Sequence, residues 1–492
     1  MGCCTVTAQK FWIVGSTVVI LALALTIGLL WPTVSLKYML YPQLELKEGS
    51  LNYDNWKESP IPIHFEIYFF NWTNHEDVSN HSIKPHFTEM GPYTFTEKHI
   101  RTNITWNSNH TVFFYQKRLW EFDPERSNGS LSDQVTNLNV IAATAGYSSR
   151  YFNNALKLAI GFLMGNGRAP LVVTKTVNEL LFEGYDDPLL TLIRANENPD
   201  FPKPPFDKFG WFVDRNDSYT YDGNFTMFTG TDDIFNMGNL QLWNDEEKVN
   251  LYRGDCDKIF GTTGELMPPI KKGEKPDLTV FATDVCRTVT VKYDSEYSKH
   301  GINGYKWIAD DSVFDNGVKY PEKACFCSAQ EESCPDLLPG VFNASSCKFG
   351  APAFVSFPHF YLAHEEYRNA VEGMKPSKED HEFSIAVEPT TGIPLYVKAQ
   401  LQINLLMQPY EWTPTFRDVP EVMMPMFWFR QAVELTPELA SQAKIAVMLP
   451  SIGVWVAYGL AGVGGWLLII GIFCFMLVWR KAAGEADDQL LN

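Results

Sequence analysis

Two long apolar stretches, one near each end of the chain, form its strongest pattern. Residues 453–479 contain no charged side chain and make a helix about 40 Å long at 1.5 Å per residue, which is enough to cross a bilayer core. Residues 11–31 form a second uncharged run. A buried soluble helix rarely runs so long without a charge, and a signal peptide has a shorter apolar region. We therefore predict two transmembrane helices, an ectodomain at 32–452, and tails at 1–10 and 480–492.

Small residues line one side of the second apolar stretch. They recur at every fourth position, at Gly453, Ala457, Ala461 and Gly465. A ridge of this kind lets another helix approach closely. It predicts helix packing within the membrane, and self-association of the protein is a hypothesis that follows from it.

Charges and glycosylation motifs indicate which side of the membrane each part occupies. Lys10, Arg480 and Lys481 flank the apolar stretches on the tail side, as expected for cytoplasmic flanks. Asn-x-Ser/Thr motifs occur only between the two stretches, which predicts a glycosylated lumenal or extracellular ectodomain. The eight candidate glycosylation sites are Asn71, Asn80, Asn103, Asn109, Asn128, Asn216, Asn224 and Asn343.

The cysteines divide between two environments. The ectodomain has an even number, which in an oxidising compartment predicts three disulfides with fifteen possible connectivities. Zinc binding is the rival interpretation, but two of these cysteines are separated by only one residue and no paired histidines follow at ligand spacing. The ectodomain cysteines are Cys256, Cys286, Cys325, Cys327, Cys334 and Cys347. Candidate palmitoylation sites at the cytoplasmic half of the membrane are Cys3, Cys4 and Cys474.

Composition and missing motifs exclude several functions. A net charge of −18 disfavours a nucleic-acid partner, which asks for a basic surface. The chain has no Gly-x-Ser-x-Gly, His-Glu-x-x-His or phosphate-binding Gly-rich Lys motif. His75, His81 and His86 are not spaced to share a helix face. We expect no catalytic residue, no metal site and no cofactor.

Alternating apolar and polar residues predict strands in the ectodomain. Residues 61–69 alternate in this way, and residues 395–405 give the longest alternation. A Pro-Thr-Thr-Gly turn at 389–392 joins the longer strand to a shorter one at 383–387, so we predict a long hairpin. The Gly-Pro pair within residues 89–93 is a turn signal.

Between these strands the pattern becomes helical. Residues 135–165 contain no proline, and Leu156, Ala159, Ile160 and Leu163 repeat at helical spacing, which predicts one or two helices. Residues 176–179 match a capping box, and a helix from there toward Glu183 is expected. Pro188 ends that helix or starts another.

Several short motifs, taken together and in order, resemble the class B scavenger receptor family, whose members include fatty acid translocase. Within that family the chain is most similar to the croquemort and epithelial membrane protein members. The resemblance covers nearly the whole chain and combines two terminal spans, a glycosylated loop and a six-cysteine cluster. Its motifs lie at residues 70–74, 89–93, 184–188, 222–225, 282–287, 325–327, 357–360, 388–392 and 402–405.

The resemblance implies an α+β fold: a large antiparallel β-barrel with an apical helical bundle, here about 135–195, and a disulfide-rich region at 256–347. It also implies the pairs Cys256–Cys325, Cys286–Cys347 and Cys327–Cys334. Family members bind lipoproteins, fatty acids, phospholipids or anionic cell surfaces, apoptotic or microbial, and are thought to pass lipid through an apolar tunnel. The apolar face of the strand at 395–405 fits such a tunnel, but it fits a filled barrel core equally well.

One motif departs from the family pattern. Fatty acid translocase has a Lys-Ser-Lys after its apical helix, whereas this chain has Asn166, Gly167 and Arg168. The candidate ligand-binding cations are Arg150, Lys157, Arg168 and Lys175. For each of these four side chains, an ordinary solvated charge on a helix is an equally good interpretation.

The short C-terminal tail carries one more motif. Asp487, Leu490 and Leu491 resemble an acidic dileucine sorting signal, with a plain disordered tail as the alternative.

Two functions therefore stay open. One is a plasma-membrane receptor that binds and conducts lipid, and the other is a protein-cargo sorting or adhesion receptor of endosomes and lysosomes.

Overall fold

The computed structural model describes residues 2–165, 167–195, 204, 206–326 and 337–490. The chain divides into two compact units. Met1–Glu45 and Glu438–Asn492 form the terminal unit, and Leu46–Pro437 form the ectodomain unit.

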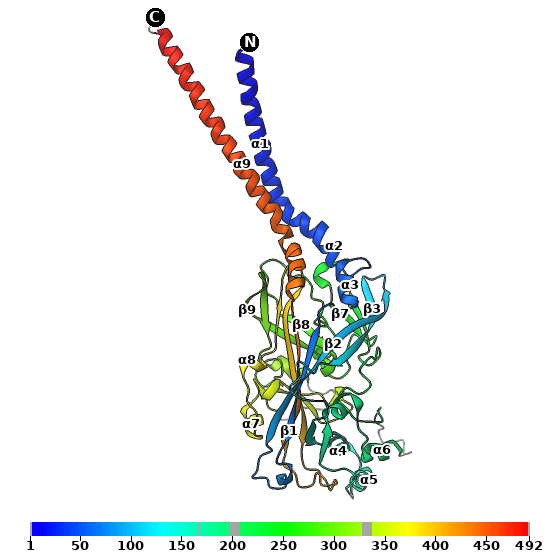
Figure 1. Cartoon of the computed structure of the whole chain (residues 1–492). Helices are drawn as coiled ribbons and strands as arrows, with labels where there is room; N and C mark the ends of the chain where they lie inside the picture. Colours follow the sequence, from blue (N-terminus) through cyan, green and yellow to red (C-terminus); the bar gives the residue numbers. More distant parts are fainter. Residues whose placement is uncertain (1, 166, 196–203, 205, 327–336, 491–492) are drawn as a thin grey trace. The chain divides into compact units, whose positions relative to one another are not determined.

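The terminal unit consists of two long apolar helices, coloured blue and red in Figure 1. Helix α1 (Gly2–Ser35) continues through Pro32 and is followed by a π-helical turn, η1 (Leu36–Leu40), and by α2 (Tyr41–Leu44). Helix α9 is Pro437–Leu490. Val14–Leu44 and Pro437–Leu477 are long and apolar enough to cross a membrane, so each candidate span passes its predicted limit at the ectodomain end only.

Only part of the predicted small-residue ridge packs against α1. A Cβ on Gly453 would lie about 2.0 Å from the ring of Trp31, so only glycine fits at this contact. Gly464 lies similarly close to Leu21, whereas a Cβ on Gly465 would meet no described heavy atom within 4 Å. The ridge prediction is therefore wrong at Gly465, because the face of α9 that contacts α1 includes the preceding residue instead.

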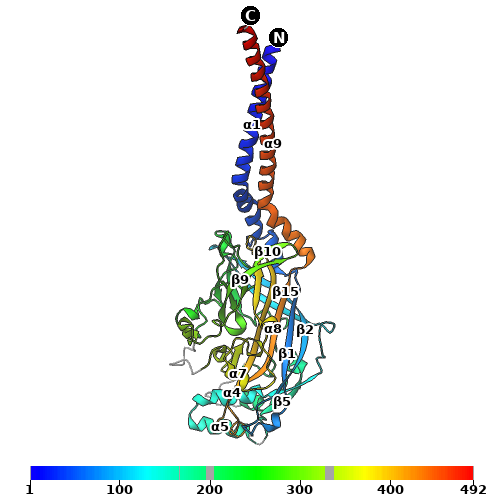
Figure 2. The ribbon, with the colours of Figure 1, turned by 90° about the vertical axis from the view of Figure 1, so that its left-hand side faces the viewer.

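The ectodomain is built on one antiparallel sheet of thirteen strands (Figures 1 and 2). Its main path runs β7-β6-β3-β2-β1-β15-β14-β13-β10-β9-β8, and β12 pairs with both β11 and β14. The strands are β1 (Ile63–Trp72), β2 (Phe87–Trp106), β3 (Thr111–Phe122), β6 (Asn224–Phe228), β7 (Leu240–Trp243), β8 (Leu278–Ala282), β9 (Arg287–Lys299), β10 (Ile302–Ile308), β11 (Val341–Asn343), β12 (Ala353–Ser356), β13 (Ser384–Val387), β14 (Pro394–Met407) and β15 (Val422–Glu434).

A short connecting segment nearly closes this sheet into a barrel. The backbone N–H of Leu240, on edge strand β7, donates to the carbonyl of Gly261 (2.8 Å). The N–H of Phe281, on edge strand β8, donates to the carbonyl of Thr262 (2.8 Å). Gly261 has φ +85°, and a Cβ there would lie 2.4 Å from the carbonyl oxygen of Thr279. The predicted α+β class with a barrel ectodomain is confirmed.

The long hairpin predicted from the alternating pattern is present. Strands β13 and β14 pair antiparallel, with Ile385 opposite Val397. The polar face of β14, however, is also buried: Gln400, Gln402 and Asn404 have no exposed surface. Their amides are hydrogen-bonded, for example from Gln400 Nε2 to the carbonyl of Glu382 (3.0 Å). The segment that follows β12 in the sequence therefore covers this face of β14, although the alternating pattern alone would expose it to solvent.

The predicted turn at 89–93 is wrong. Strand β2 runs straight through it, and the ladder with β1 shifts register there: Ile67 faces Tyr93, whereas Phe69 faces Met90. A bulge of this kind accommodates a proline that cannot donate to the ladder. The Gly-Pro pair marks an irregularity within a strand rather than its end.

The helical region differs from prediction at its start. Residues Gln134–Leu138 form strand β4, which pairs with β5 (Val172–Thr176) in a separate two-stranded sheet. The capping box is confirmed, because Thr176 Oγ1 accepts from the Glu179 N–H (3.2 Å) and the Glu179 carboxylate accepts from the Thr176 N–H (2.8 Å). The helices of the ectodomain are α3 (Leu51–Lys57), α4 (Val140–Ser148), α5 (Asn154–Met164), α6 (Pro188–Ala195), α7 (Glu365–Asn369) and α8 (Lys378–His381).

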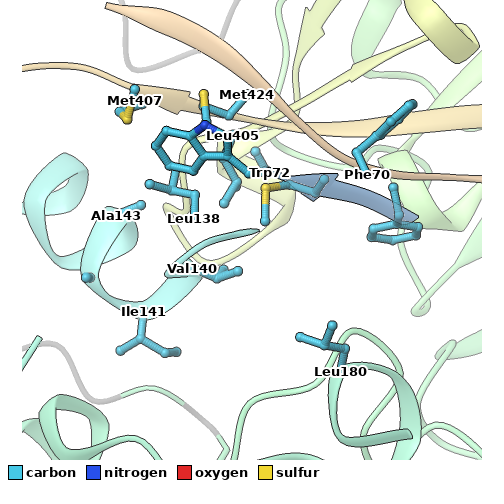
Figure 3. Close-up of a cluster of buried hydrophobic side chains, with 14 of the residues drawn as sticks. Phe70, Trp72, Leu138, Val140, Ile141, Ala143, Leu180, Leu405, Met407 and Met424 are labelled. Atoms are coloured by element: carbon cyan, nitrogen blue, oxygen red, sulfur yellow. The ribbon is translucent and has the colours of Figure 1, made fainter. Parts of the chain in front are cut away.

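Helix α4 packs into an aromatic and aliphatic core. Val140, Ile141 and Ala143 on α4 gather near Trp72 of β1 and Met407 of β14 (Figure 3). All of these side chains are buried. This burial attaches the helical region to the sheet at one end of the barrel strands.

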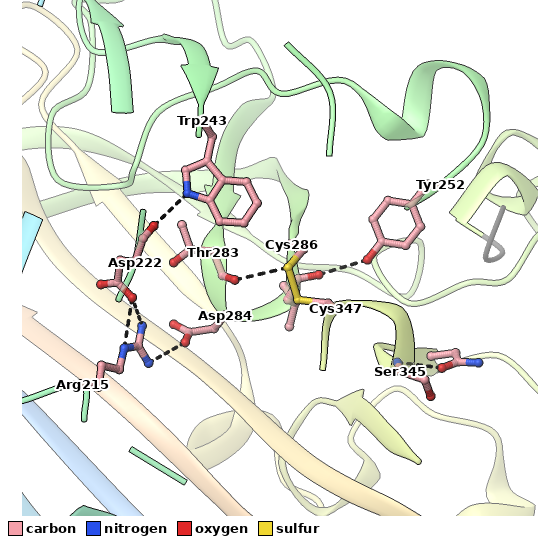
Figure 4. Close-up of a disulfide and its surroundings, with 11 residues drawn as sticks. Arg215, Asp222, Trp243, Tyr252, Thr283, Asp284, Cys286, Ser345 and Cys347 are labelled. Atoms are coloured by element: carbon pink, nitrogen blue, oxygen red, sulfur yellow. Dashed lines mark hydrogen bonds and ion pairs between the residues drawn. A yellow bond between two sulfur atoms is a disulfide. The ribbon is translucent and has the colours of Figure 1, made fainter. Parts of the chain in front are cut away.

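Two disulfides tie the irregular region together. Cys256 pairs with Cys325, and Cys286 pairs with Cys347 (Figure 4). These are two of the pairs that the family resemblance implies. Cross-links that close loops of this length contribute about 4 kcal/mol each in the chain-entropy model. Cys327 and Cys334 lie outside the described residues, so their pairing stays a prediction.

Candidate ligand-binding surface

Helix α5 has apolar residues on two opposite faces. Asn153 caps its start by accepting a hydrogen bond from the Leu156 N–H (3.0 Å). Ile160 is buried, as the helical repeat predicts. Leu158 and Phe162, one turn apart on the other face, are 71% and 70% exposed. Large apolar side chains gathered on a surface mark an interaction site more often than scattered ones do.

Close contacts hold α5 firmly in place. A Cβ on Gly161 would lie 2.1 Å from the carbonyl oxygen of Trp412, so the helix and this loop touch backbone to backbone. The indole of Trp412 donates to Ser149 Oγ (2.8 Å), and Thr415 Oγ1 donates to the carbonyl of Ala169 (2.8 Å). The exposed face of α5 is thus presented by a rigid element.

Three of the four predicted cations gather around α5 and stack on aromatic rings. Lys157 Nζ lies 4.4 Å from the ring centroid of Trp412, and the Arg168 guanidinium lies 5.9 Å from that of Phe162. Arg150 lies over Tyr147 at 3.3 Å. Stacking of this kind orients a cation without neutralising it.

The fourth cation stands apart from this group. Lys175, on β5, lies over the ring of Tyr185 at 4.7 Å. Burial, together with the neighbouring Asp187, raises the pKa of that tyrosine well above its ordinary value. We define the α5 surface as Leu158, Phe162, Arg150, Lys157 and Arg168, and leave Lys175 out of it.

The sequence analysis names the cations of the α5 surface as candidates but does not name its apolar residues. Leu158 and Phe162 are spaced at i and i+4, which is a helical signal in itself. Almost every residue of α5 is apolar, so periodicity assigns an inner face without showing that a second face is exposed. That distinction depends on where Trp412 packs, far away in the sequence.

A small cavity lies inside the ectodomain, beside β4 and β5. Its volume is about 10 Å³, close to the least space that holds one water molecule. Asn137 and Tyr185 supply its polar atoms, and the Tyr185 hydroxyl is buried with no hydrogen-bond partner among the described residues. Its other lining residues are apolar: Phe69, Val135, Leu138, Val140, Val173, Leu180, Trp211 and Met426.

The described histidines and carboxylates do not assemble a metal centre. Within this part of the chain, no group of three or more His, Cys, Asp or Glu side chains could hold a metal ion. At one polar cluster, His359 Nε2 lies 2.7 Å from a Glu89 carboxylate oxygen and its Nδ1 accepts from the Lys375 N–H. Both ring nitrogens of His359 are therefore committed to structural hydrogen bonds.

The sequon asparagines are all at least partly exposed, but they differ in their contacts. Asn80, Asn103, Asn109 and Asn128 are exposed. Asn216 is exposed too, yet its Oδ1 accepts from the Trp120 N–H (3.0 Å) and its Nδ2 donates to the Trp120 carbonyl (3.3 Å). The Nδ2 atom to which a glycan would be attached is thus the atom that donates to the Trp120 carbonyl.

Comparison with known proteins identifies the family of the chain. The model described as the CD36 family matches residues 13–475. The chain is 34% identical to "Protein peste" of Drosophila melanogaster over 442 residues, which is 88% of this chain and 75% of that protein. It is 31% identical to "Scavenger receptor class B member 1" of Mus musculus over 479 residues, 95% of this chain and 91% of that one. It is 30% identical to "Lysosome membrane protein 2" of Homo sapiens over 449 residues, which is 90% of this chain and 89% of that one. The chain therefore belongs to the CD36 family, the class B scavenger receptors that its motifs resemble.

Proposed function

We propose that this protein is a membrane-embedded receptor that binds amphiphilic lipid ligands with anionic groups on the α5 surface. The observation that carries the proposal is the pair of exposed apolar side chains, Leu158 and Phe162, on a rigidly held helix beside Lys157 and Arg168. Acyl chains contact the apolar pair, and phosphate or carboxylate groups meet the cations. Lipoproteins and anionic cell surfaces present both kinds of group together.

Burial of the apolar pair is the larger favourable contribution to such a contact. Full burial of a leucine or phenylalanine side chain contributes about 1.5–3 kcal/mol. A cation at a partly exposed site adds less, because water and salt screen it. The apolar pair therefore supplies most of the affinity, and Lys157 and Arg168 favour anionic over neutral headgroups.

We further propose that bound lipid moves through the barrel toward the membrane. The cavity beside β4 and β5 is about 10 Å³ and must widen before it admits an acyl chain. Its lining is mostly apolar, which suits lipid. The family resemblance supports this conduit, and a receptor that only docks its ligand is the alternative.

A second candidate function is the sorting of protein cargo in endosomes and lysosomes. Two observations favour it: the similarity to a protein named for the lysosome membrane, and the dileucine motif in the tail. Leu491 lies outside the described residues, so this motif rests on sequence. The α5 surface suits a protein partner as well as a lipid, and binding measurements distinguish them.

We expect the variant carrying Leu158→Ser and Phe162→Ser to bind vesicles containing phosphatidylserine at least about tenfold more weakly, because apolar burial is lost. Flotation of the full-length protein in detergent-free nanodiscs with labelled vesicles measures this binding. Val318→Ser removes an equally exposed apolar side chain elsewhere (68% exposed) and should leave binding unchanged. Equal loss in the two variants would contradict the α5 assignment.

Changing Leu490 and Leu491 to alanine is expected to move the protein from endosomes or lysosomes to the cell surface. The dileucine pair is the part of the motif that a sorting adaptor reads. Surface biotinylation and co-localisation with a lysosomal marker measure the change, with Gln489→Ala as the matched tail control. An unchanged distribution would favour the plain tail.

A further inference from the structure

A buried histidine lies between two carboxylates inside the barrel. His99 is 4% exposed, on β2. Its Nε2 is 2.6 Å from a carboxylate oxygen of Glu97, and its Nδ1 is 2.7 Å from one of Glu265. The side chain of Glu97 has no exposed surface, and that of Glu265 is 23% exposed. Both ring nitrogens therefore face acceptors at hydrogen-bonding distance.

With Glu97 and Glu265 ionised, this geometry is satisfied only by the protonated ring, and their charged partners outweigh burial and hold the pKa of each carboxyl group below its ordinary value. A neutral imidazole carries one N–H, so one of its nitrogens would turn a lone pair toward a carboxylate oxygen. Only the imidazolium donates to both. Burial alone lowers the pKa of His99, but the charges of Glu265 and Glu97 and their hydrogen bonds outweigh that effect and raise it above the ordinary value.

Charged groups on β2 itself and on three other segments complete the network around His99. Arg101, also on β2, pairs with Glu265. Arg118, on β3, lies 3.5 Å from Glu97 and 2.7 Å from Asp222. Arg215 lies 2.8 Å from Asp222 and 2.7 Å from Asp284 (Figure 4).

A neutral amide and one further cation border this network. Gln431, on β15, donates to Glu97 (2.8 Å), and Lys348 adds positive charge near Asp284. Among the ion-paired groups, four carboxylates face three guanidiniums. A proton on His99 adds a fourth cation to these ion-paired groups.

Glu265 connects this network to the closure of the barrel. It follows Gly261 and Thr262, whose carbonyls accept from Leu240 on β7 and from Phe281 on β8. Its carboxylate then reaches across to His99 and Arg101 on β2. The contact fixes the closing segment, residues 261–267, to a strand that is not its sheet neighbour.

We propose that His99 is a proton-dependent latch that holds segment 261–267 on β2, so that the barrel closure is tighter in acid and loosens as the pH rises. The sign follows from linkage. A group whose folded-state pKa is raised stabilises the fold fully below its unfolded pKa, about 6.5 for histidine, and that stabilisation is lost as the pH rises to the folded value. A receptor with this latch is most firmly closed in endosomes and lysosomes. The latch does not depend on which ligand the receptor binds.

Hydrogen exchange of the full-length protein in detergent micelles tests the latch. Above pH 6.5, the opening constant of peptides covering 262–267 should rise by up to about tenfold per pH unit, after correction for the intrinsic rate. The opening constant of reference peptides from β14 should rise less over the same pH range. In the His99→Gln variant the opening constant of 262–267 should be larger at pH 6 and no longer depend on pH in this range.

His300→Gln, at an exposed turn, is the matched histidine control and should keep the wild-type pH dependence. The same pH dependence in wild type and His99→Gln would overturn the latch. If His99→Gln does not fold, the wild-type protein alone decides: a ratio of opening constants, 262–267 over β14, that stays constant from pH 6 to 9 rejects the proposal.

Discussion

Replacing Arg215 with methionine is expected to lower the free energy of unfolding of the ectodomain by about 3–5 kcal/mol, because it removes the closest cation of Asp284 and one of the two cations paired with the buried Asp222. Arg215 and Asp222 are each 5% exposed. Burial alone lowers the pKa of Arg215, but Asp284 and Asp222 outweigh it and raise that pKa. Likewise Arg215 and Arg118 outweigh burial and hold the pKa of Asp284 well below its usual range.

A loss of this size approaches the total stability of many domains, so we expect most of the Arg215→Met protein to stay in the endoplasmic reticulum. Endoglycosidase sensitivity measures retention, and thermal unfolding of the purified fraction measures stability. Arg194→Met is the matched control, because Arg194 pairs with Asp207, whose side chain is 80% exposed; an exposed pair contributes about 0–1 kcal/mol. Similar losses in both variants would show that the buried network contributes no more than a surface pair.

The elements that sequence predicted well are those whose signal is local. The hairpin of β13 and β14 follows from period-two alternation and a turn of four residues, and the capping box at Thr176 follows from two residues three apart. Both depend on neighbours in the chain. The strand at 134–138 was missed because the residues that follow it repeat at helical spacing, and its partner β5 lies more than thirty residues later.

The failures share a physical cause, which is contact between distant segments. Gln400 and Gln402 look solvent-facing until the chain that follows β12 covers them. From sequence, His99 is an ordinary strand residue. Its partner Glu265 is at least 164 positions away from the β2 residues that it contacts, so no local pattern indicates the pair. Periodicity reports which side a residue faces, but it carries no information about what lies on that side.

The proposed conduit makes the second large prediction. Val173 lines the interior cavity, whereas its neighbour Val172 packs against the same core outside it. Replacing Val173 with phenylalanine adds far more volume than a cavity of about 10 Å³ offers. Val173 is only partly buried on β5, so the strand can absorb the usual overpacking cost of about 1–3 kcal/mol. If lipid passes here, its uptake should fall close to that of cells without the receptor.

Val172→Phe adds the same volume to the same strand without entering the cavity, and uptake should stay near wild type. Uptake of a fluorescent fatty acid, measured together with vesicle binding and surface level, separates the steps. Binding on α5 involves Leu158 and Phe162 rather than Val173, so it should survive both changes. Equal uptake loss in the two variants, or a parallel fall in binding and uptake for Val173→Phe, would reject a path through this cavity. The receptor would then act as a docking surface, and lipid would have to reach the membrane outside the barrel.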